Sequence, residues 1–128
     1  MKFKILIPLY NDWKSLLKLL ENIDNQINET DNIFSIVVVN DGSTEKVIND
    51  FPNYKKIHSI KIINLKKNIG HARSIATGLK FILENDDFDY IIPMDSDGED
   101  RPNEIKELIK KIDPQSNLPI VCERVKRS

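Results

Sequence analysis

Four carboxylates stand within six positions of one another, and they are Asp95, Asp97, Glu99 and Asp100. They follow directly on the apolar run Tyr90–Met94. Two carboxylates about 5 Å apart repel by roughly 3 kcal/mol at an effective dielectric constant of about 20. In a cleft they need a cation, a proton or a basic partner, whereas a loop that faces water tolerates them. Asp95 and Asp97 lie nearest the apolar run and are candidate ligands for Mg²⁺ or Mn²⁺, which commonly bridge to substrate phosphates. A solvated acidic loop is the alternative.

A second candidate segment is Asn-Asp-Gly-Ser-Thr, residues 40–44. Asp41 could accept hydrogen bonds from a base or a ribose, and Gly42 would let the backbone approach that ligand. The alternative is an ordinary turn, because Asn-Asp-Gly is strong turn chemistry. In that case Ser43 or Thr44 would cap a following helix.

The third candidate segment is Asn-Ile-Gly-His-Ala-Arg, residues 68–73. It predicts a helix start, where backbone N–H groups and Arg73 could contact a phosphate. His71 is a further candidate for that contact, although a lone histidine is more often structural or solvated. The alternative is that Asn68 only caps the helix and that Gly70 eases the bend.

Short apolar runs alternate with amphipathic stretches along the chain, and this alternation predicts how the candidate residues are placed. The predicted strands are Phe3–Leu9, Phe34–Val39, Ile60–Leu65, Tyr90–Met94 and Leu118–Cys122. The predicted helical stripes are Trp13, Leu16, Leu17, Leu20, Ile23 and Ile27; then Ala72, Ile75, Ala76, Leu79, Ile82 and Leu83; then Ile105, Leu108, Ile109 and Ile112. Residues 44–54 show a weaker pattern, which predicts one short helix.

This β-α alternation predicts an α/β fold: a three-layer α/β/α sandwich, Rossmann-like, with a mainly parallel sheet. Ligands of such folds bind at the carboxyl ends of the strands. The segments above follow predicted strands, as does Pro8–Asn11 after the first one. Neither a G-x-G-x-x-G motif nor a Walker A lysine loop is present. A bound nucleotide would therefore depend on carboxylates and a metal ion.

Bulk composition narrows the function classes. A chain of 128 residues suggests one domain. Lys plus Arg number 19 and Asp plus Glu number 20, which argues against a broad nucleic-acid-binding surface. A single cysteine permits no internal disulfide and favours a cytoplasmic setting.

Four segments in this order resemble a known family. "ILIPLYND", "VVVNDGST", "NIGHARSIATGL" and "MDSDGEDRPNEI" are similar to the nucleotide-sugar half of family 2 glycosyltransferases with the GT-A fold. The similarity is to the dolichol- or polyprenyl-phosphate sugar synthase type, and it covers nearly the whole chain. Asn40 stands where the family has a further acid, and Ile75 and Ala76 depart from its usual Ala-Arg-Asn pattern near Arg73.

The resemblance implies roles for individual residues. Pro8 and Tyr10 would contact the base, and Asp41 would bind it. Asp95 would lie near the ribose and sugar, with Asp97 on the metal. The implied substrate-binding residues are Pro8, Tyr10, Asn11, Asp41, Gly70, Arg73, Asp95 and Ser96, and the implied metal ligands are Asp95 and Asp97.

The resemblance also implies an activity. The expected reaction is metal-dependent transfer of a sugar from a UDP- or GDP-linked donor to a lipid phosphate or a saccharide, with inversion. Such enzymes continue into an acceptor-binding half that carries the catalytic base. We therefore expect residues 1–128 to be a truncated donor half, with no catalytic residue and no transfer by itself. Self-association through the apolar segment Leu118–Cys122 would follow. Cell-envelope or polysaccharide biosynthesis, in the cytoplasm or at the inner face of the membrane, is the implied setting.

Three alternatives stay open at this point. One is a fragment that binds a nucleotide sugar without catalysis. Another is a haloacid-dehalogenase-like phosphatase with Asp95 as nucleophile and Asp97 as acid/base, although that family places its motif on the first strand. The last is a signalling receiver domain, which would need an acidic pair after strand one, where Tyr10, Asn11 and Asp12 stand.

Overall fold

The computed structural model describes residues 1–27, 32–48 and 50–95. The predicted helix over 105–112 and the predicted strand Leu118–Cys122 lie outside these residues. The elements of the described part are β1 (Lys2–Leu9), α1 (Trp13–Gln26), β2 (Ile33–Asn40), β3 (Ile57–Asn64), α2 (His71–Asn85) and β4 (Tyr90–Pro93). The first four predicted strands and the first two amphipathic helices are thus confirmed.

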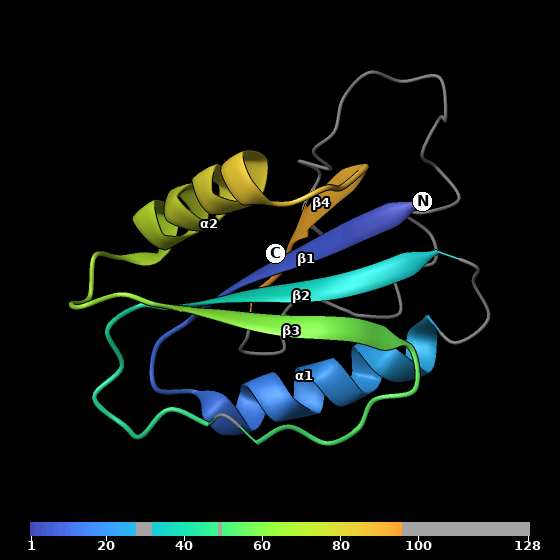
Figure 1. Ribbon diagram of the computed structural model, residues 1–128. Helices are drawn as coiled ribbons and strands as arrows, with labels where there is room; N and C mark the ends of the chain where they lie inside the picture. The colour runs from blue at the N-terminus through green and yellow to red at the C-terminus, as the bar shows by residue number, and fades with distance from the viewer. Residues whose placement is uncertain (28–31, 49, 96–128) are drawn as a thin grey trace, which may run out of the picture.

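The described strands form a parallel sheet in the order β3-β2-β1-β4. The chain moves outward from β1 to β3 and then crosses back over β1 to add β4. Because crossovers between parallel strands are right-handed, this reversal of direction places α1 and α2 on opposite faces of the sheet. Figure 1 shows α1 on one side of the strands and α2 on the other. The predicted three-layer α/β/α sandwich is confirmed.

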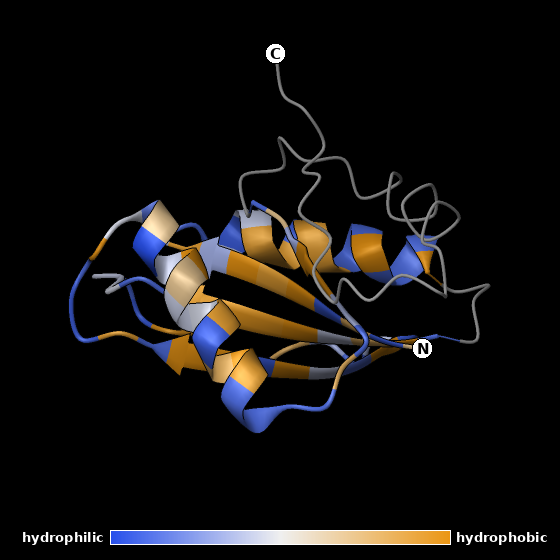
Figure 2. Cartoon of the chain, turned by 90° about the horizontal axis from the view of Figure 1, so that it is seen from above, coloured by the Kyte–Doolittle hydropathy of each residue, from blue (hydrophilic) through white to orange (hydrophobic). Residues whose placement is uncertain are grey.

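The two inner strands, β1 and β2, carry the core. Nearly all their residues are buried, because a helix layer lies over each face. Figure 2 shows the strands as largely hydrophobic ribbons with hydrophilic residues near their ends. The larger apolar cluster joins the sheet to α1, and a smaller one joins it to α2. Among the described residues, no helix is both long and apolar enough to cross a membrane.

Helix α2 meets the sheet through a face that only partly coincides with the predicted stripe, since Ile75, Leu79 and Ile82 do pack against the sheet. The residues predicted to be buried but found exposed are Ala72, Ala76 and Leu83. The fully covered residues are Ser74, Gly78 and Ile82. A Cβ on Gly78 would lie 2.4 Å from Leu6 Cδ1 and 2.9 Å from Val39 Cγ2. The two small residues therefore let the helix approach β1 and β2 closely, which a count of large apolar residues does not reveal. In α1 the predicted stripe holds better: Leu19 is also buried, and Leu17 is only half-buried.

The connection from β2 to β3 corrects another prediction. The short helix predicted over residues 44–54 is wrong, since the described part of this segment contains no helix. Its apolar side chains still pack against the α1-side core, and they are Val47, Ile48, Phe51 and Tyr54. Pro52 lacks the N–H that a helix would need, and the turn at Gly42 opens the segment in a left-handed conformation.

A buried carboxylate fixes the far end of this connection. Asp24, near the end of α1, is only 8% exposed. Its oxygens accept hydrogen bonds from the backbone N–H groups of Lys55, Lys56 and Ile57 at 3.0, 2.7 and 3.0 Å. Burial alone raises the pKa of Asp24, but these bonds outweigh it and hold the pKa below its ordinary value. The charged form of Asp24 therefore stabilises the start of β3.

We expect Asp24→Asn to lower the free energy of unfolding by about 2 kcal/mol at pH 7, because fewer charge-assisted bonds remain. Since the folded pKa is depressed, the contribution of Asp24 is present above the unfolded pKa and is lost as the pH falls through the folded one. Urea denaturation at pH 7 and pH 3 measures this, with Asp50→Asn as an exposed control. A difference between wild type and Asp24→Asn that is as large at pH 3 as at pH 7 would contradict the assignment.

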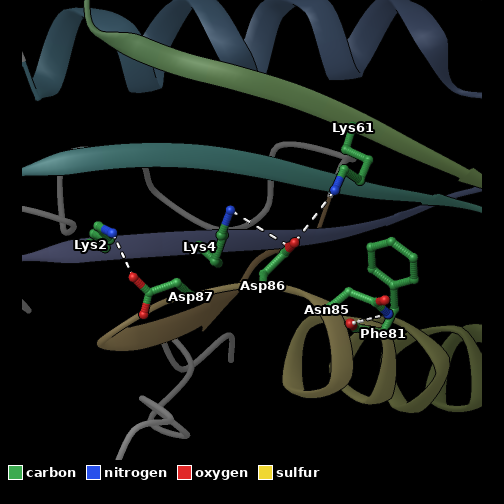
Figure 3. A network of polar contacts seen from close by, with 7 residues as sticks. All are labelled: Lys2, Lys4, Lys61, Phe81, Asn85, Asp86 and Asp87. Atoms are coloured by element: carbon green, nitrogen blue, oxygen red, sulfur yellow. Dashed lines mark hydrogen bonds and ion pairs between the residues drawn. The ribbon is translucent and has the colours of Figure 1, made fainter.

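A polar network holds the C-terminal end of α2 against the sheet (Figure 3). The carboxylate of Asp86, just after α2, pairs with Lys61 Nζ at 3.4 Å and Lys4 Nζ at 3.6 Å. Lys61 also lies 5.1 Å from the ring centroid of Phe81. This network lies away from the carboxyl edge of β1 and β4, so its effect there is indirect: it fixes the far end of the helix that starts at the candidate site.

Candidate functional site

The strand order marks one edge of the sheet as the place to look for a ligand. In parallel α/β sheets, ligands bind beyond the carboxyl ends of the strands, where the strand order reverses. Here the reversal falls between β1 and β4. Tyr10 follows β1 and Asp95 follows β4, with Asp41 next to them after β2.

In the described residues the pairing between β1 and β4 extends to Met94. Met94 N donates to Leu6 O at 2.9 Å, which extends the β1–β4 pairing by one bond. The backbone N–H and C=O groups of successive strand residues point alternately to the two neighbouring strands. The backbone of Pro8, like that of Leu6, therefore faces the β4 side, and proline has no N–H to donate there. Pro8 itself is buried within β1 opposite Val39. Tyr10, two residues further, is 48% exposed at this edge.

Asn11 joins the loop after β1 to the loop after β2. Its backbone lies in the left-handed region at φ 59°, which asparagine tolerates better than most residues. Its N–H donates to Ser43 Oγ, its Nδ2 donates to Thr44 Oγ1, and its Oδ1 accepts from Glu45 N, each at 2.9 Å. Ser43 and Thr44 are therefore occupied with Asn11 and cap no helix. The predicted role of Asn11 in substrate binding stays a prediction.

Asp41, just after β2, is the centre of the site's hydrogen bonding. Its side chain is buried, and Oδ1 accepts from Ile69 N at 2.7 Å. Oδ2 accepts from Gly70 N and from Asn68 Nδ2, both at 3.1 Å. A carboxylate has about four lone-pair positions, so contact with a further donor is compatible with these bonds. Asp41 thus organises the loop before α2, and its predicted contact with a base stays a prediction.

Gly42 allows the two strand-end loops to touch. A Cβ at this position would lie 2.4 Å from both Asn68 N and Lys67 C, which are backbone atoms. Beneath them, Asn40 Nδ2 donates to Asn64 Oδ1 at 2.9 Å across the paired ends of β2 and β3. The loops after β2 and β3 therefore form one unit.

The start of α2 differs from the predicted capped helix. Asn68 does not cap it, since its Nδ2 donates to Asp41. The residue before the helix is Gly70 at φ 97°, and no side chain caps the first turn. Arg73 is exposed in that turn. Its predicted contact with a phosphate is untested.

The end of β4 brings in a residue that the sequence left ambiguous. Asp95 is 7% exposed, and its Oδ1 lies 3.2 Å from His71 Nε2 at the start of α2. Asp95 follows β4 and His71 begins α2, so both lie at the carboxyl edge. This shared edge was the only feature of the sequence that could have indicated that they lie close together. Their pairing was not predicted, because it depends on α2 crossing back to the β4 side.

The described residues do not by themselves form a metal site. Among them, no group of three or more His, Cys, Asp or Glu could hold a metal ion. Ser96, Asp97, Glu99 and Asp100 lie outside the described residues. Asp95 alone nevertheless fits the chemistry of Mg²⁺, which proteins usually bind through one or two carboxylates together with substrate phosphates and water.

The described site is thus a continuous run of contacts along one edge. It passes from Asn11 to the loop after β2, from Asp41 to Gly70, and from the adjacent His71 to Asp95. Two buried carboxylates, Asp41 and Asp95, belong to this run. The segment that leads into the first turn of α2 carries exposed basic residues, namely Lys66, Lys67, His71 and Arg73. This arrangement suits a ligand that has both hydrogen-bond donors and a charged phosphate group.

Comparison with known proteins identifies similar chains. A family model described as glycosyl transferase family 2 matches residues 4–128. The undecaprenyl-phosphate 4-deoxy-4-formamido-L-arabinose transferase of Proteus mirabilis is 31% identical over 111 residues, covering 84% of this chain and 32% of that protein. The dolichol-phosphate mannosyltransferase of Pyrococcus furiosus is 29% identical over 126 residues, covering 98% of this chain and 34% of that protein.

A solved structure agrees with the fold. S. aureus TarS, residues 1–349 in complex with UDP, matches with a TM-score of 0.62 at 26% identity, covering 86% of this chain and 31% of that one. This likeness confirms the predicted GT-A arrangement. The chain spans about a third of the length of these two relatives and of the TarS chain of residues 1–349.

Proposed function

The chain belongs to glycosyl transferase family 2, and from this membership we propose that residues 1–128 are the donor-binding part of a glycosyltransferase. In this proposal the carboxyl edge of the sheet binds a UDP- or GDP-linked sugar together with Mg²⁺ or Mn²⁺. Family membership also replaces the phosphatase and the receiver domain as explanations of the acidic segment. A donor-binding part that does not itself catalyse transfer is compatible with the proposal.

The observation that carries the proposal is that two buried carboxylates follow the strands on either side of β1, at the carboxyl edge where the strand order reverses. Asp41 follows β2 and is bonded by the loop before α2, and Asp95 follows β4 and lies against His71, the first residue of α2. Such a point is where α/β proteins bind nucleotides. The UDP complex of TarS supports a uridine nucleotide as the first candidate.

Each residue has a role that its position permits. The exposed ring of Tyr10 would stack on the base, and Asp41 would accept from it while holding the loop before α2. Arg73 would approach the diphosphate from the first turn of α2. Asp95, with Asp97, would hold the divalent cation, which when bound neutralises charge on the diphosphate leaving group.

The proposed transfer forms a bond from an acceptor oxygen to the anomeric carbon of the sugar. The bond from that carbon to the diphosphate oxygen breaks, and the nucleoside diphosphate leaves with the electron pair. Attack from the opposite face would invert the anomeric configuration. An ionised phosphate oxygen has no proton to lose, whereas a hydroxyl acceptor would release its proton to water. We propose no catalytic residue within residues 1–128.

Two relatives guide the choice of acceptor. One is an undecaprenyl-phosphate transferase and one a dolichol-phosphate mannosyltransferase. We therefore propose a polyprenyl phosphate as the acceptor, with a saccharide as the alternative. A lipid acceptor would place the reaction at a membrane surface. We propose the cytoplasmic side, which agrees with a nucleotide-sugar donor and a single unpaired cysteine. The corresponding process would be cell-envelope biosynthesis.

We expect the chain to bind UDP or GDP more tightly with Mn²⁺ than with EDTA, by about tenfold or about 1.4 kcal/mol. The reason is that the cation offsets the charge of the diphosphate beside the carboxylates. Isothermal titration calorimetry with each nucleotide under both conditions measures the effect. Asp95→Asn should remove the gain from Mn²⁺, and the exposed Asp50→Asn serves as its control.

The outcomes separate the parts of the proposal. Equal affinity with Mn²⁺ and with EDTA would remove the metal from it. Binding of neither nucleotide by the folded chain would remove the donor site altogether. A nucleotide that binds only to Asp95→Asn would show that the carboxylate repels the diphosphate rather than holding its cation.

A further inference from the structure

We propose that His71 is a positioning residue for Asp95, and that it fixes the carboxylate which meets the cation–diphosphate part of the donor. The proposal rests on the donor site described above and adds a residue to it. It assigns to His71 no contact with the sugar nucleotide itself. Its basis is the geometry at the start of α2.

The first observation is the contact between the two side chains. His71 Nε2 lies 3.2 Å from Asp95 Oδ1, where the Asp95 side chain is 10% exposed and the His71 side chain 51%. The imidazole therefore lies on the outer side of a carboxylate that is otherwise shielded. A polar ring nitrogen at this distance favours one rotation of the carboxylate over others.

The second observation is that the backbone of His71 is itself held in place. The N–H groups of the two preceding residues, Ile69 and Gly70, donate to Asp41 at 2.7 and 3.1 Å. On the other side, Ser74 N donates to Gly70 O at 3.0 Å and closes the first turn of α2. The imidazole thus projects from a backbone that is fixed at both ends.

The third observation concerns the position of Asp95 relative to the end of β4. Asp95 lies two residues beyond Pro93, the last residue of β4, and Met94 N to Leu6 O is the last β1–β4 bond among the described residues. Asp95 therefore lies beyond the regular ladder of β4. His71 adds a contact from α2 to this carboxylate, and groups that orient metal-binding side chains typically change metal affinity 10- to 100-fold.

The test separates positioning from direct contact with a phosphate and from general loosening of the fold. Affinity for UDP and GDP is measured by calorimetry, with Mn²⁺ and with EDTA, for wild type, His71→Ala and His71→Gln. We expect His71→Ala to lose about 10- to 100-fold in affinity with Mn²⁺ and little with EDTA. His71→Gln, which keeps an N–H near the position of Nε2, should recover part of the loss. His58→Ala is the matched control, because His58 is exposed at the start of β3 and is the other histidine of the chain.

An NMR readout tests the contact without any nucleotide. With only two histidines in the chain, the imidazole signals of His71 and His58 can be assigned by substitution. Asp95→Asn should shift the ring signals of His71 and leave those of His58 in place. Unshifted His71 signals would overturn the contact, whatever the chain binds.

Each calorimetric outcome supports or overturns the positioning role of His71. Unchanged affinity with Mn²⁺ in folded His71→Ala would overturn the positioning role. An equal loss with Mn²⁺ and with EDTA would indicate that His71 contacts the phosphate directly or that the loop has collapsed, and would overturn it as well. Absence of binding by the wild-type chain would instead overturn the donor proposal, and with it the role of His71.

Discussion

Replacing Asp41 with alanine should weaken nucleoside diphosphate binding about 10- to 150-fold, equivalent to roughly 1.5–3 kcal/mol. One part of the loss is the acceptor proposed for the base. Another part is the loop before α2, since Ile69 N and Gly70 N would lose their acceptor. We also expect the free energy of unfolding to fall by about 2 kcal/mol, while the sheet and both helices remain.

Matched variants distinguish the two parts of this effect. Asn68→Ala removes one donor to Asp41 and leaves the carboxylate in place. If Asp41 acts only by holding the loop, Asn68→Ala should reproduce part of the loss in affinity. If Asp41 accepts a hydrogen bond from the base, Asn68→Ala should bind the nucleotide nearly as tightly as wild type does. Calorimetry gives the affinities, and amide NMR signals of residues 68–70 report the loop. Wild-type affinity in folded Asp41→Ala would exclude both roles.

The positions of the strands were predictable because burial on both faces leaves a simple signal. β1 and β2 are almost continuous in apolar residues, and the order of elements then implies a parallel sheet and its ligand edge. The same reasoning placed the polar segments at the carboxyl ends of the strands. It depended on local composition and on a general rule of topology.

Contacts between segments could not be predicted in this way. The face of α2 is set by Ser74 and Gly78, where small size allows close approach to β1 and β2. The segment after β2 shows a weak helical pattern, yet its apolar residues pack on the α1-side core without a helix. The sequence indicated only a ligand contact or a turn for Asp41, and its bonds to the loop before α2 require that loop to fold back over Gly42. In each case a distant partner, rather than a local preference, decides the outcome.

The close approach of the two loops leads to the second large effect. Gly42→Ala should lower the free energy of unfolding by about 2–5 kcal/mol, combining roughly 1–2 for a side chain at positive φ with 1–3 for overpacking. Its φ is +67°, and the atoms that a Cβ would meet at 2.4 Å belong to the backbone of Lys67 and Asn68, which cannot move aside as a flexible side chain could. Gly70→Ala is the matched control: its φ is +97°, but nothing lies within 4 Å of its Cβ position, so it should show backbone strain alone, about 1–3 kcal/mol.

The same change also tests whether the loops after β2 and β3 act as one unit. Gly42→Ala displaces the loop that Asp41 holds, so its effect should be smaller when the bonds to Asp41 are already gone. We therefore expect the costs of Gly42→Ala and Asp41→Ala to be non-additive, with a coupling of about 0.5–3 kcal/mol in a double-mutant cycle measured by urea denaturation. Gly70→Ala paired with Asp24→Asn should be additive, because Asp24 bonds to the start of β3 and Gly70 lies beyond the end of that strand. Additive costs for Gly42 and Asp41 would mean that the contact seen between the loops does not constrain them, and that the site lacks the fixed geometry on which donor binding is proposed to depend.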